Sequence, residues 1–150
     1  MTGISLKISL TELGKTAERL LELSHMEKRE ILDGIGAEVE TQTKRRIADE
    51  KESPDSIEWP EWSPKYEKTR HAGHSLLQNE NDLLNSISYI VYIDGSKVEI
   101  GTNLIYAATH QFGDDTRNIP ARTYLGFSSE NLEDIQAIVD DFMSEHMKSL

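Results

Sequence analysis

The strongest constraint on the fold is a pair of apolar segments joined by the dipeptide Asp94-Gly95. Residues 86–93 are apolar at both sets of alternate positions, and residues 97–101 are apolar at one set. An Asp-Gly pair between two such segments is a strong signal for a tight hairpin turn. The pattern predicts an antiparallel hairpin, and its first strand is expected to be central in the sheet or covered on both faces.

The N-terminal third predicts one short strand and two helices. Apolar residues alternate with polar ones over residues 4–8, as in a half-buried strand. Thr11 is a suitable N-cap for a first helix, and Ser24 with Glu27 forms a capping-box pattern for a second helix over residues 26–48. The second helix has an apolar stripe with a spacing of four residues: Ile31, Ile35, Val39, Thr43 and Ile47.

Gly34 and Gly36 lie inside this second helical pattern, where each glycine costs roughly 1 kcal/mol against alanine. Gly36 is next to the apolar stripe, so it either permits close packing of another element or is a tolerated weak point.

The C-terminal third predicts a helix over residues 104–112, which Gly113 ends, then a strand over residues 124–127 and a final helix. Ser128 or Ser129 is the expected N-cap of the final helix. Its apolar stripe comprises Leu132, Ile135, Ile138, Val139 and Phe142. Its opposite face, either simply solvated or a docking surface, comprises Glu130, Glu133, Asp134, Asp140, Asp141 and Glu145.

These elements predict a single α+β domain over residues 1–150, since the chain has the length of one domain and shows no linker or repeat. We expect N-terminal helices, an antiparallel sheet with the hairpin at its centre, and a C-terminal helix packed on the sheet.

Charge and composition exclude several classes of function. The net charge of -11 disfavours wrapping or coating nucleic acid. The chain has no cysteine, so it has neither a disulfide framework nor a thiolate metal site. No apolar run approaches the ~20 residues of a membrane helix, and the first residues lack a signal-peptide pattern. We therefore expect the protein to act on the inner side of a membrane.

Two irregular segments are candidates for binding. Residues 49–75 contain prolines, many charges and both tryptophans, so this long segment is expected to be mobile or functional. Trp59 and Trp62 either fold back on the domain or meet a partner subunit. In the second segment, residues 106–125, we expect two apolar anchors, Phe112 and Ile119, to hold the polar residues between them in solvent as a binding loop. We expect Arg122 to point outward beside the loop, or alternatively to bond backbone carbonyls of the loop.

The histidines offer little for catalysis. His71 and His74 have the spacing of a metal pair, but no acidic third ligand lies near them in sequence. His110, on the predicted short helix, is expected to be buried and bonded to backbone rather than to act as a general base. The prediction is no metal, no cofactor and no catalytic residue; the competing hypothesis, a hydrolase using one of these histidines, predicts metal in the purified protein.

Basic residues support a second hypothesis, a nucleic-acid-binding accessory protein. Three of them end the second predicted helix, where their ordinary role is to complement the helix dipole. The hypothesis predicts DNA binding that falls steeply with salt. The set is Lys44, Arg45, Arg46, Lys65, Lys68 and Arg70.

Several short motifs occur in a fixed order along the chain. They are Trp59-Pro60-x-Trp62-Ser63-Pro64, Leu76-Leu77, Asp82-Leu83, Ser86-Ile87, Val98-x-Ile100-Gly101-Thr102-Asn103, Tyr106-Ala107, His110-Gln111-Phe112-Gly113, Ile119-Pro120-Ala121-Arg122 and Leu125-Gly126. From about Ile31 to Val139, this ordered set resembles the phage virion morphogenesis family, which includes tail-completion proteins of contractile-tailed phages. Asn81 stands where the family usually has glycine, although asparagine tolerates the left-handed backbone. Thr123 stands where a second proline is common, which predicts a less rigid corner.

The resemblance implies a non-enzymatic structural protein of a phage or prophage that completes the tail and makes it competent for head joining. It implies a ring-forming homo-oligomer at the head–tail junction, with tail tube or terminator proteins and head–tail connector proteins as partners. The implied location is the virion, or the host bacterial cytoplasm during assembly, with no membrane or nucleic-acid partner. The hypothetical interface residues are Trp59, Trp62, Asp114, Asp115, Arg117 and Arg122.

Overall fold

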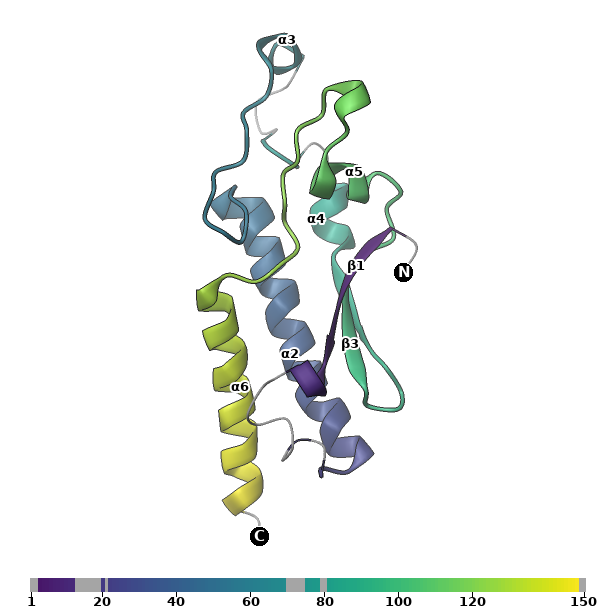
Figure 1. The fold of residues 1–150 in the computed structure, drawn as a ribbon, viewed down its shortest axis with the longest axis vertical. Helices are drawn as coiled ribbons and strands as arrows, with labels where there is room; N and C mark the ends of the chain where they lie inside the picture. Colours follow the sequence, from purple (N-terminus) through teal and green to yellow (C-terminus); the bar gives the residue numbers. More distant parts are fainter. Residues whose placement is uncertain (1–2, 13–19, 21, 70–74, 79–80, 149–150) are drawn as a thin grey trace.

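A computed structural model describes residues 3–12, 20, 22–69, 75–78 and 81–148 of the chain. It shows an α+β fold, as predicted, with a three-stranded antiparallel sheet and helices packed against it (Figure 1). The elements in chain order are β1 (Ile4–Ser9), η1 (Leu10–Glu12), α2 (His25–Arg45), η3 (Arg46–Glu50), α3 (Pro64–Glu67), α4 (Asp82–Ser86), β2 (Ser88–Val91), β3 (Lys97–Thr102), α5 (Ala107–Phe112), η4 (Asp115–Arg117) and α6 (Ser129–Lys148).

The predicted hairpin is confirmed as β2 and β3. Gly95 has a φ of +71°, which favours glycine, and the backbone N–H of Ser96 donates to the Asp94 carboxylate at 2.9 Å. The first hairpin strand is not central, however, because the sheet order is β1-β3-β2. The N-terminal strand β1 pairs with the free side of β3, so β2 is left at an edge. Ile90 is accordingly 51% exposed, although the apolar pattern suggested cover on both faces.

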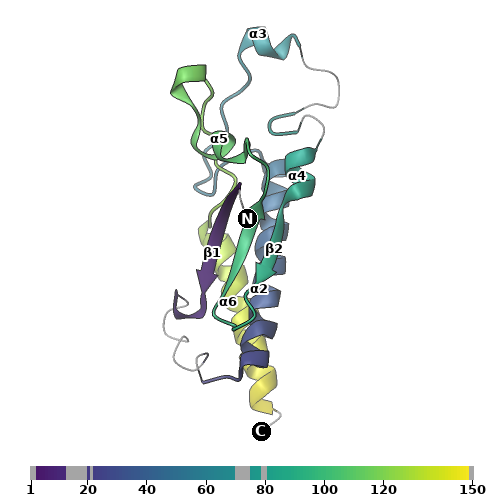
Figure 2. The same ribbon diagram turned by 90° about the vertical axis from the view of Figure 1, so that its right-hand side faces the viewer.

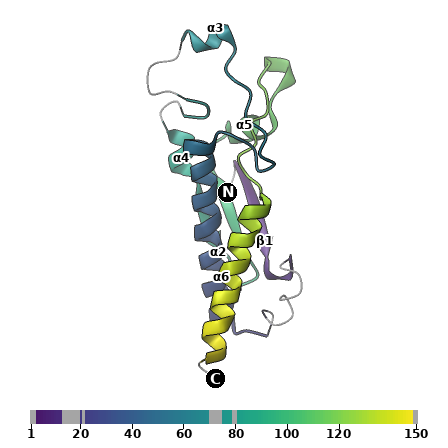
Figure 3. The same ribbon diagram turned by 90° about the vertical axis from the view of Figure 1, so that its left-hand side faces the viewer.

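The sheet has one covered face. Helices α2 and α6 lie side by side behind the sheet in Figure 2 and in front of it in Figure 3. All five predicted stripe residues are buried, four on α2 and Ile47 on η3, which confirms the helical pattern. A side chain at Gly36 would collide with the ring of Tyr89 on β2 and approach Val98 on β3. Gly36 therefore permits the close contact of α2 with the sheet.

The N-terminal ends of the two long helices form as their sequences predict, whereas the second predicted helix, expected to reach Ala48, is α-helical only to Arg45 and continues as η3. The side chain of Ser24 accepts a hydrogen bond from the Glu27 backbone N–H at 3.2 Å, which caps α2. At the start of α6, Ser128 and Asn131 cap each other: the backbone N–H of each donates to the other's side chain, both at 3.0 Å. On α6, Ile135 and Val139 are buried as predicted, whereas Leu132 is 54% exposed and lies off the apolar face.

The region over residues 124–127, predicted as a strand, is irregular instead. Its backbone bonds go to side chains, mainly those of Gln111 and Arg46, rather than to a neighbouring strand. The left-handed backbone foreseen at Asn81 is confirmed, with a φ of +63°.

The helix expected after Thr11, with its apolar residues Leu13, Ala17, Leu20 and Leu21, lies almost entirely outside the described residues. Of the helices that are described, none has the length and apolar character needed to cross a membrane.

Candidate functional site: a composite tip

The two predicted binding segments meet at one end of the molecule, opposite the C-terminus (Figure 1). Helix α3 projects there with the tryptophan-containing segment, and the turn η4 projects beside it. We call residues 58–69 and 105–122 together the tip. The two segments are far apart in sequence, so specific side chains must hold them together.

Trp59 is part of the core rather than an exposed contact. Its side chain is only 4% exposed, and its indole N–H donates to the carbonyl of Thr123 at 2.9 Å. Of the two alternatives, this tryptophan folds back on its own domain. Trp62 is half-buried against the edge of the core, with its ring centroid 6.1 Å from that of Tyr66. Since Tyr66 is 47% exposed, it is the outer member of this pair.

Arg122 does not point outward. It is 8% exposed; its Nε donates to the carbonyl of Pro60 at 2.8 Å and its Nη2 to the carbonyl of Glu61 at 3.2 Å. The expected outward orientation was wrong, and the alternative, a guanidinium bonded to backbone carbonyls, is the one observed. The carbonyls belong to the tryptophan segment, not to the loop of Arg122 itself. Arg122 therefore joins the two halves of the tip.

Asp114 organises the turn at the end of the second segment. Its carboxylate accepts from the backbone N–H and hydroxyl of Thr116, at 3.0 and 2.6 Å, and from Nε of Arg117 at 2.7 Å. These hydrogen bonds, first of all those from Thr116 and Arg117, lower the pKa of Asp114 to about 2. Asp114 and Ile119 also form an isolated antiparallel bridge. The turn thus has a defined shape, with Asp115 and Arg117 exposed on it.

The expected apolar anchor at Phe112 was wrong, because its side chain is 71% exposed. Ala107 and Gln111 instead form the buried face of the short helix α5. The Gln111 amide bonds the returning chain: its Oε1 accepts from the backbone N–H groups of Tyr124 and Leu125 at 3.0 and 3.1 Å. Tyr124, fully buried, donates its hydroxyl to the Ala107 carbonyl at 2.8 Å. Hydrogen bonds of Gln111 and Tyr124, rather than burial of Phe112, therefore hold α5 against the returning chain.

The tip exposes several large apolar side chains. Ile105 is 94% exposed, Phe112 71% and Tyr106 43%, and Tyr66 of α3 lies on the other segment. Sequence patterns missed this feature because they assign apolar residues to the core. Exposed apolar groups on a defined frame are typical of a protein-binding surface.

His110 is partly buried on α5, next to the exposed apolar residues of the tip. Its Nδ1 is buried and has no hydrogen-bond partner among the described residues, so the expected bond to the backbone is not observed at that atom. Burial, then the nearby charge of Arg122, lowers the pKa of His110. Its ring meets Tyr106 edge-on, at a centroid distance of 5.6 Å. Within the described part of the chain, no three His, Asp or Glu residues could together hold a metal ion; His71 and His74 fall outside that part.

The basic residues proposed for nucleic acid do not form one surface. Arg46 is 2% exposed and donates to the Tyr124 carbonyl at 2.7 Å and to the Asn131 side chain at 2.6 Å. Lys44 and Arg45 are paired with Glu40 and Glu50, at 2.9 and 3.6 Å. Lys65 and Lys68 are exposed on and beside α3, and Arg70 lies outside the described residues.

Lys51 is a structural residue that sequence reasoning missed. Its ammonium group donates to the carbonyls of Ile47 and Leu76 and to the side chains of Ser75 and Gln78. Burial lowers its pKa to about 8. These bonds attach residues 75–78 to the end of the α2–η3 helix. No sequence pattern predicts such a lysine, because its partners, two backbone carbonyls and two polar side chains, are brought there by the fold.

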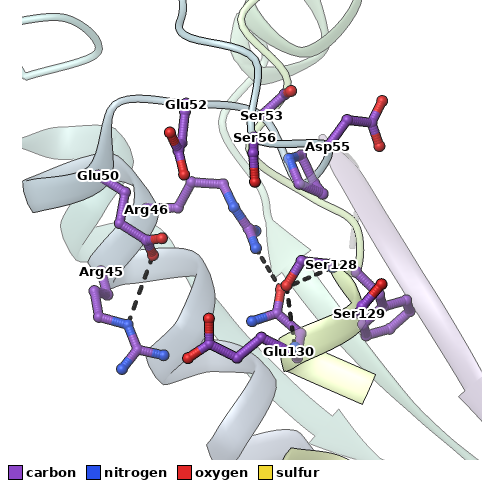
Figure 4. Close-up of a pocket in the computed structure, with 13 residues that line it drawn as sticks. Arg45, Arg46, Glu50, Glu52, Ser53, Asp55, Ser56, Ser128, Ser129 and Glu130 are labelled. Carbon is purple, nitrogen blue, oxygen red and sulfur yellow. Dashed lines mark hydrogen bonds and ion pairs between the residues drawn. The ribbon is translucent and has the colours of Figure 1, made fainter. Parts of the chain in front are cut away.

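A cavity of about 550 Å³ lies where η3, the loop after it and the N-terminus of α6 meet (Figure 4). Its lining is polar, and both of its arginines have partners there: Arg45 pairs with Glu50, and Arg46 donates to the Asn131 side chain. Neither of the two buried polar atoms that lack a partner in the described structure belongs to a residue that lines it. Within the described residues, the cavity therefore contains no unpartnered buried polar atom that would point to a ligand.

Comparison with known proteins gives one informative result. No curated protein and no solved structure matches the chain. The model of the phage virion morphogenesis family matches residues 8–144. This match covers α2, β2, β3, both segments of the tip and most of α6, and so the chain belongs to the phage virion morphogenesis family.

Proposed function

We propose that this protein is a non-enzymatic assembly protein that completes the phage tail and makes it competent to join the head. It acts as a ring of identical subunits at the head–tail junction, between tail tube or terminator proteins and head–tail connector proteins. The match of nearly the whole chain to a virion morphogenesis family is the observation that carries this proposal. Its sites of action are the assembling virion and the host cytoplasm.

The tip is the surface that contacts a neighbouring virion protein. Its exposed apolar residues supply contact area, and Asp115 and Arg117 supply charge at the rim. Trp59, Asp114 and Arg122 support this surface from beneath, because their polar groups bond within the domain. Of the residues predicted as contacts, Trp59, Asp114 and Arg122 thus support the surface, and Asp115 and Arg117 lie on it.

Complementation in vitro tests the proposal. Tails assembled without this protein are mixed with heads, with or without the purified protein, and joined particles are counted by electron microscopy and by infectivity. We expect added protein to restore joining. Tails that join heads equally well without it would contradict the proposal.

Paired variants test the role of the tip in the same assay. Phe112→Asp should reduce joining by about tenfold or more, as for loss of a central apolar contact. Leu132→Asp is the matched control, since this leucine is also more than half exposed but lies on α6. Equal activity of the two variants would exclude the tip as the contact surface.

A further inference from the structure

We propose that copies of this chain associate through the two open edges of the sheet, with β2 of one copy beside β1 of the next. This inference rests on the proposed ring and specifies which surfaces build it. Within the described residues, neither edge pairs with another strand. Addition of a strand to an open edge is a common mode of protein association, because unpaired backbone groups there can form a new ladder.

The β2 edge is short but lacks two of the usual protections against such pairing, charged residues and proline. Its sequence, Ser-Tyr-Ile-Val, contains no charged residue and no proline. Ile90 within it is 51% exposed, and Ile93 just after it is 84% exposed. The exposed face of the sheet has no helix over it in Figure 2. An unprotected apolar edge of this kind is expected to be covered in the assembled state.

The two edge strands, β1 and β2, both carry apolar residues on the side of the sheet that faces the helices. On the helix side, Ile4 and Leu6 of β1 and Tyr89 and Val91 of β2 are only partly buried. In the central strand β3 the equivalent side chains, Val98 and Ile100, are fully buried. Joining the edges of two copies would place apolar residues beside apolar residues on this side and so extend the core across the contact.

Charge also favours these edges over other surfaces. The chain has a net charge of -11, and the outer face of α6 is acidic, so most approaches between copies bring like charges together. β1 carries one charged residue, the exposed Lys7, and β2 carries none. The contact between these edges therefore avoids repulsion between acidic groups.

Strand direction determines the type of association. β1 and β2 are both antiparallel to β3, so they run parallel to each other within one chain. If copies are arranged around an axis that is parallel to the strands, the β2 strands of all copies run in the same direction along that axis. β2 of one copy then meets β1 of the next in parallel, and the contact is head-to-tail, as a closed ring requires. A two-fold dimer would instead pair β2 with β2 in antiparallel orientation.

The absence of cysteine makes cross-linking a clean test. Ile90 shares a row across the outer face of the sheet with Lys7, because both lie opposite Glu99. Three double variants combine Ile90→Cys with Lys7→Cys, Ser5→Cys or Ser9→Cys, one for each of three possible registers of the contact. On oxidation, one of the three should form a ladder of disulfide-linked oligomers. Each single variant should remain unlinked. A covalent dimer of the Ile90→Cys single variant would overturn the head-to-tail contact.

Sedimentation measures the same contact without cross-linking. Ile90→Lys should weaken self-association by about tenfold or more, while the melting temperature at low concentration stays unchanged. Leu132→Lys is the control for an added lysine on α6 and should associate normally. A wild-type chain that remains monomeric at every concentration, alone and when bound to tails, would overturn the inference.

The two proposals can fail separately. A protein that restores head joining but shows no cross-linked ladder refutes the sheet-edge contact and leaves the tail function standing. A protein that forms the ladder but does not restore joining refutes the tail function and leaves the contact standing.

Discussion

The body of this protein and its tip are stabilised by different forces. In the body, α2, α6 and the sheet bury a continuous set of aliphatic side chains, such as Ile35, Val39 and Ile100, all with 1% exposure or less. In the tip, side chains bond backbone groups of distant segments, as Arg122 does with Pro60 and Glu61. Burial is non-directional and tolerates many residue types, whereas these polar bonds require particular atoms in particular places. Substitutions should therefore act differently in the two regions.

The largest effect is expected in the body. Ile35→Ala removes a side chain with 0% exposure and should lower the free energy of unfolding by roughly 2–5 kcal/mol. Because the loss is of core packing, the whole domain should unfold at a lower urea concentration in one transition. Urea unfolding followed by circular dichroism and by tryptophan fluorescence measures this. If the two signals separate, the body and the tip do not unfold together.

An intermediate effect is expected where Arg122 joins the two halves of the tip. Arg122→Ala leaves two carbonyls without their charged donor and should cost roughly 1.5–3 kcal/mol. Arg122→Lys keeps the charge but cannot reproduce the two-nitrogen geometry, so it should recover only part of the loss. Thermal melts of the two variants measure this difference. A melt of Arg122→Ala that equals the wild type would show that the two segments are held by Trp59 and the core alone.

A small effect on stability, but a large one on assembly, is expected for Phe112. Since its side chain is 71% exposed, Phe112→Ala should change the free energy of unfolding by no more than about 0.5 kcal/mol. The same variant should reduce head joining. A strong loss of stability would mean that Phe112 packs against its own chain in solution and is not available to a partner.

The smallest effect concerns the turn around Asp114. Its pKa is lowered to about 2, so the stabilisation from its hydrogen bonds is present above the ordinary aspartate pKa and is lost as the pH falls through about 2. Protonation of Asp114 should alter the structure of the turn alone, because its hydrogen-bond partners are Thr116 and Arg117. Carboxyl NMR titration, with Asp114→Asn to identify the signal, measures the midpoint. A midpoint near the ordinary value of 3.8 would show that the turn is open in solution.

The difference between the body and the tip also explains which predictions from the sequence were correct. The α2 stripe and the turn at Gly95 were correct because periodicity and turn chemistry depend on nearby residues. The central position of β2 was wrong because nothing within the hairpin shows on which side a third strand will pair. The buried Phe112 was wrong because a short helix such as α5 buries only one face, and its neighbours select that face. The outward Arg122 was wrong because its partners are carbonyls of a segment far away in the sequence.

Sequence alone therefore determined the α+β class, the N-terminal starts of the long helices, the hairpin and the family, since each depends on local pattern or on the order of motifs. The tertiary structure alone decided which strand is central, which side chains join the two segments of the tip, and which apolar residues remain exposed. Those outcomes depend on contacts between residues far apart in the chain, such as Arg122 with Pro60 and Lys51 with Leu76. Such contacts leave no periodic signal, because their partners are backbone carbonyls that every residue type carries.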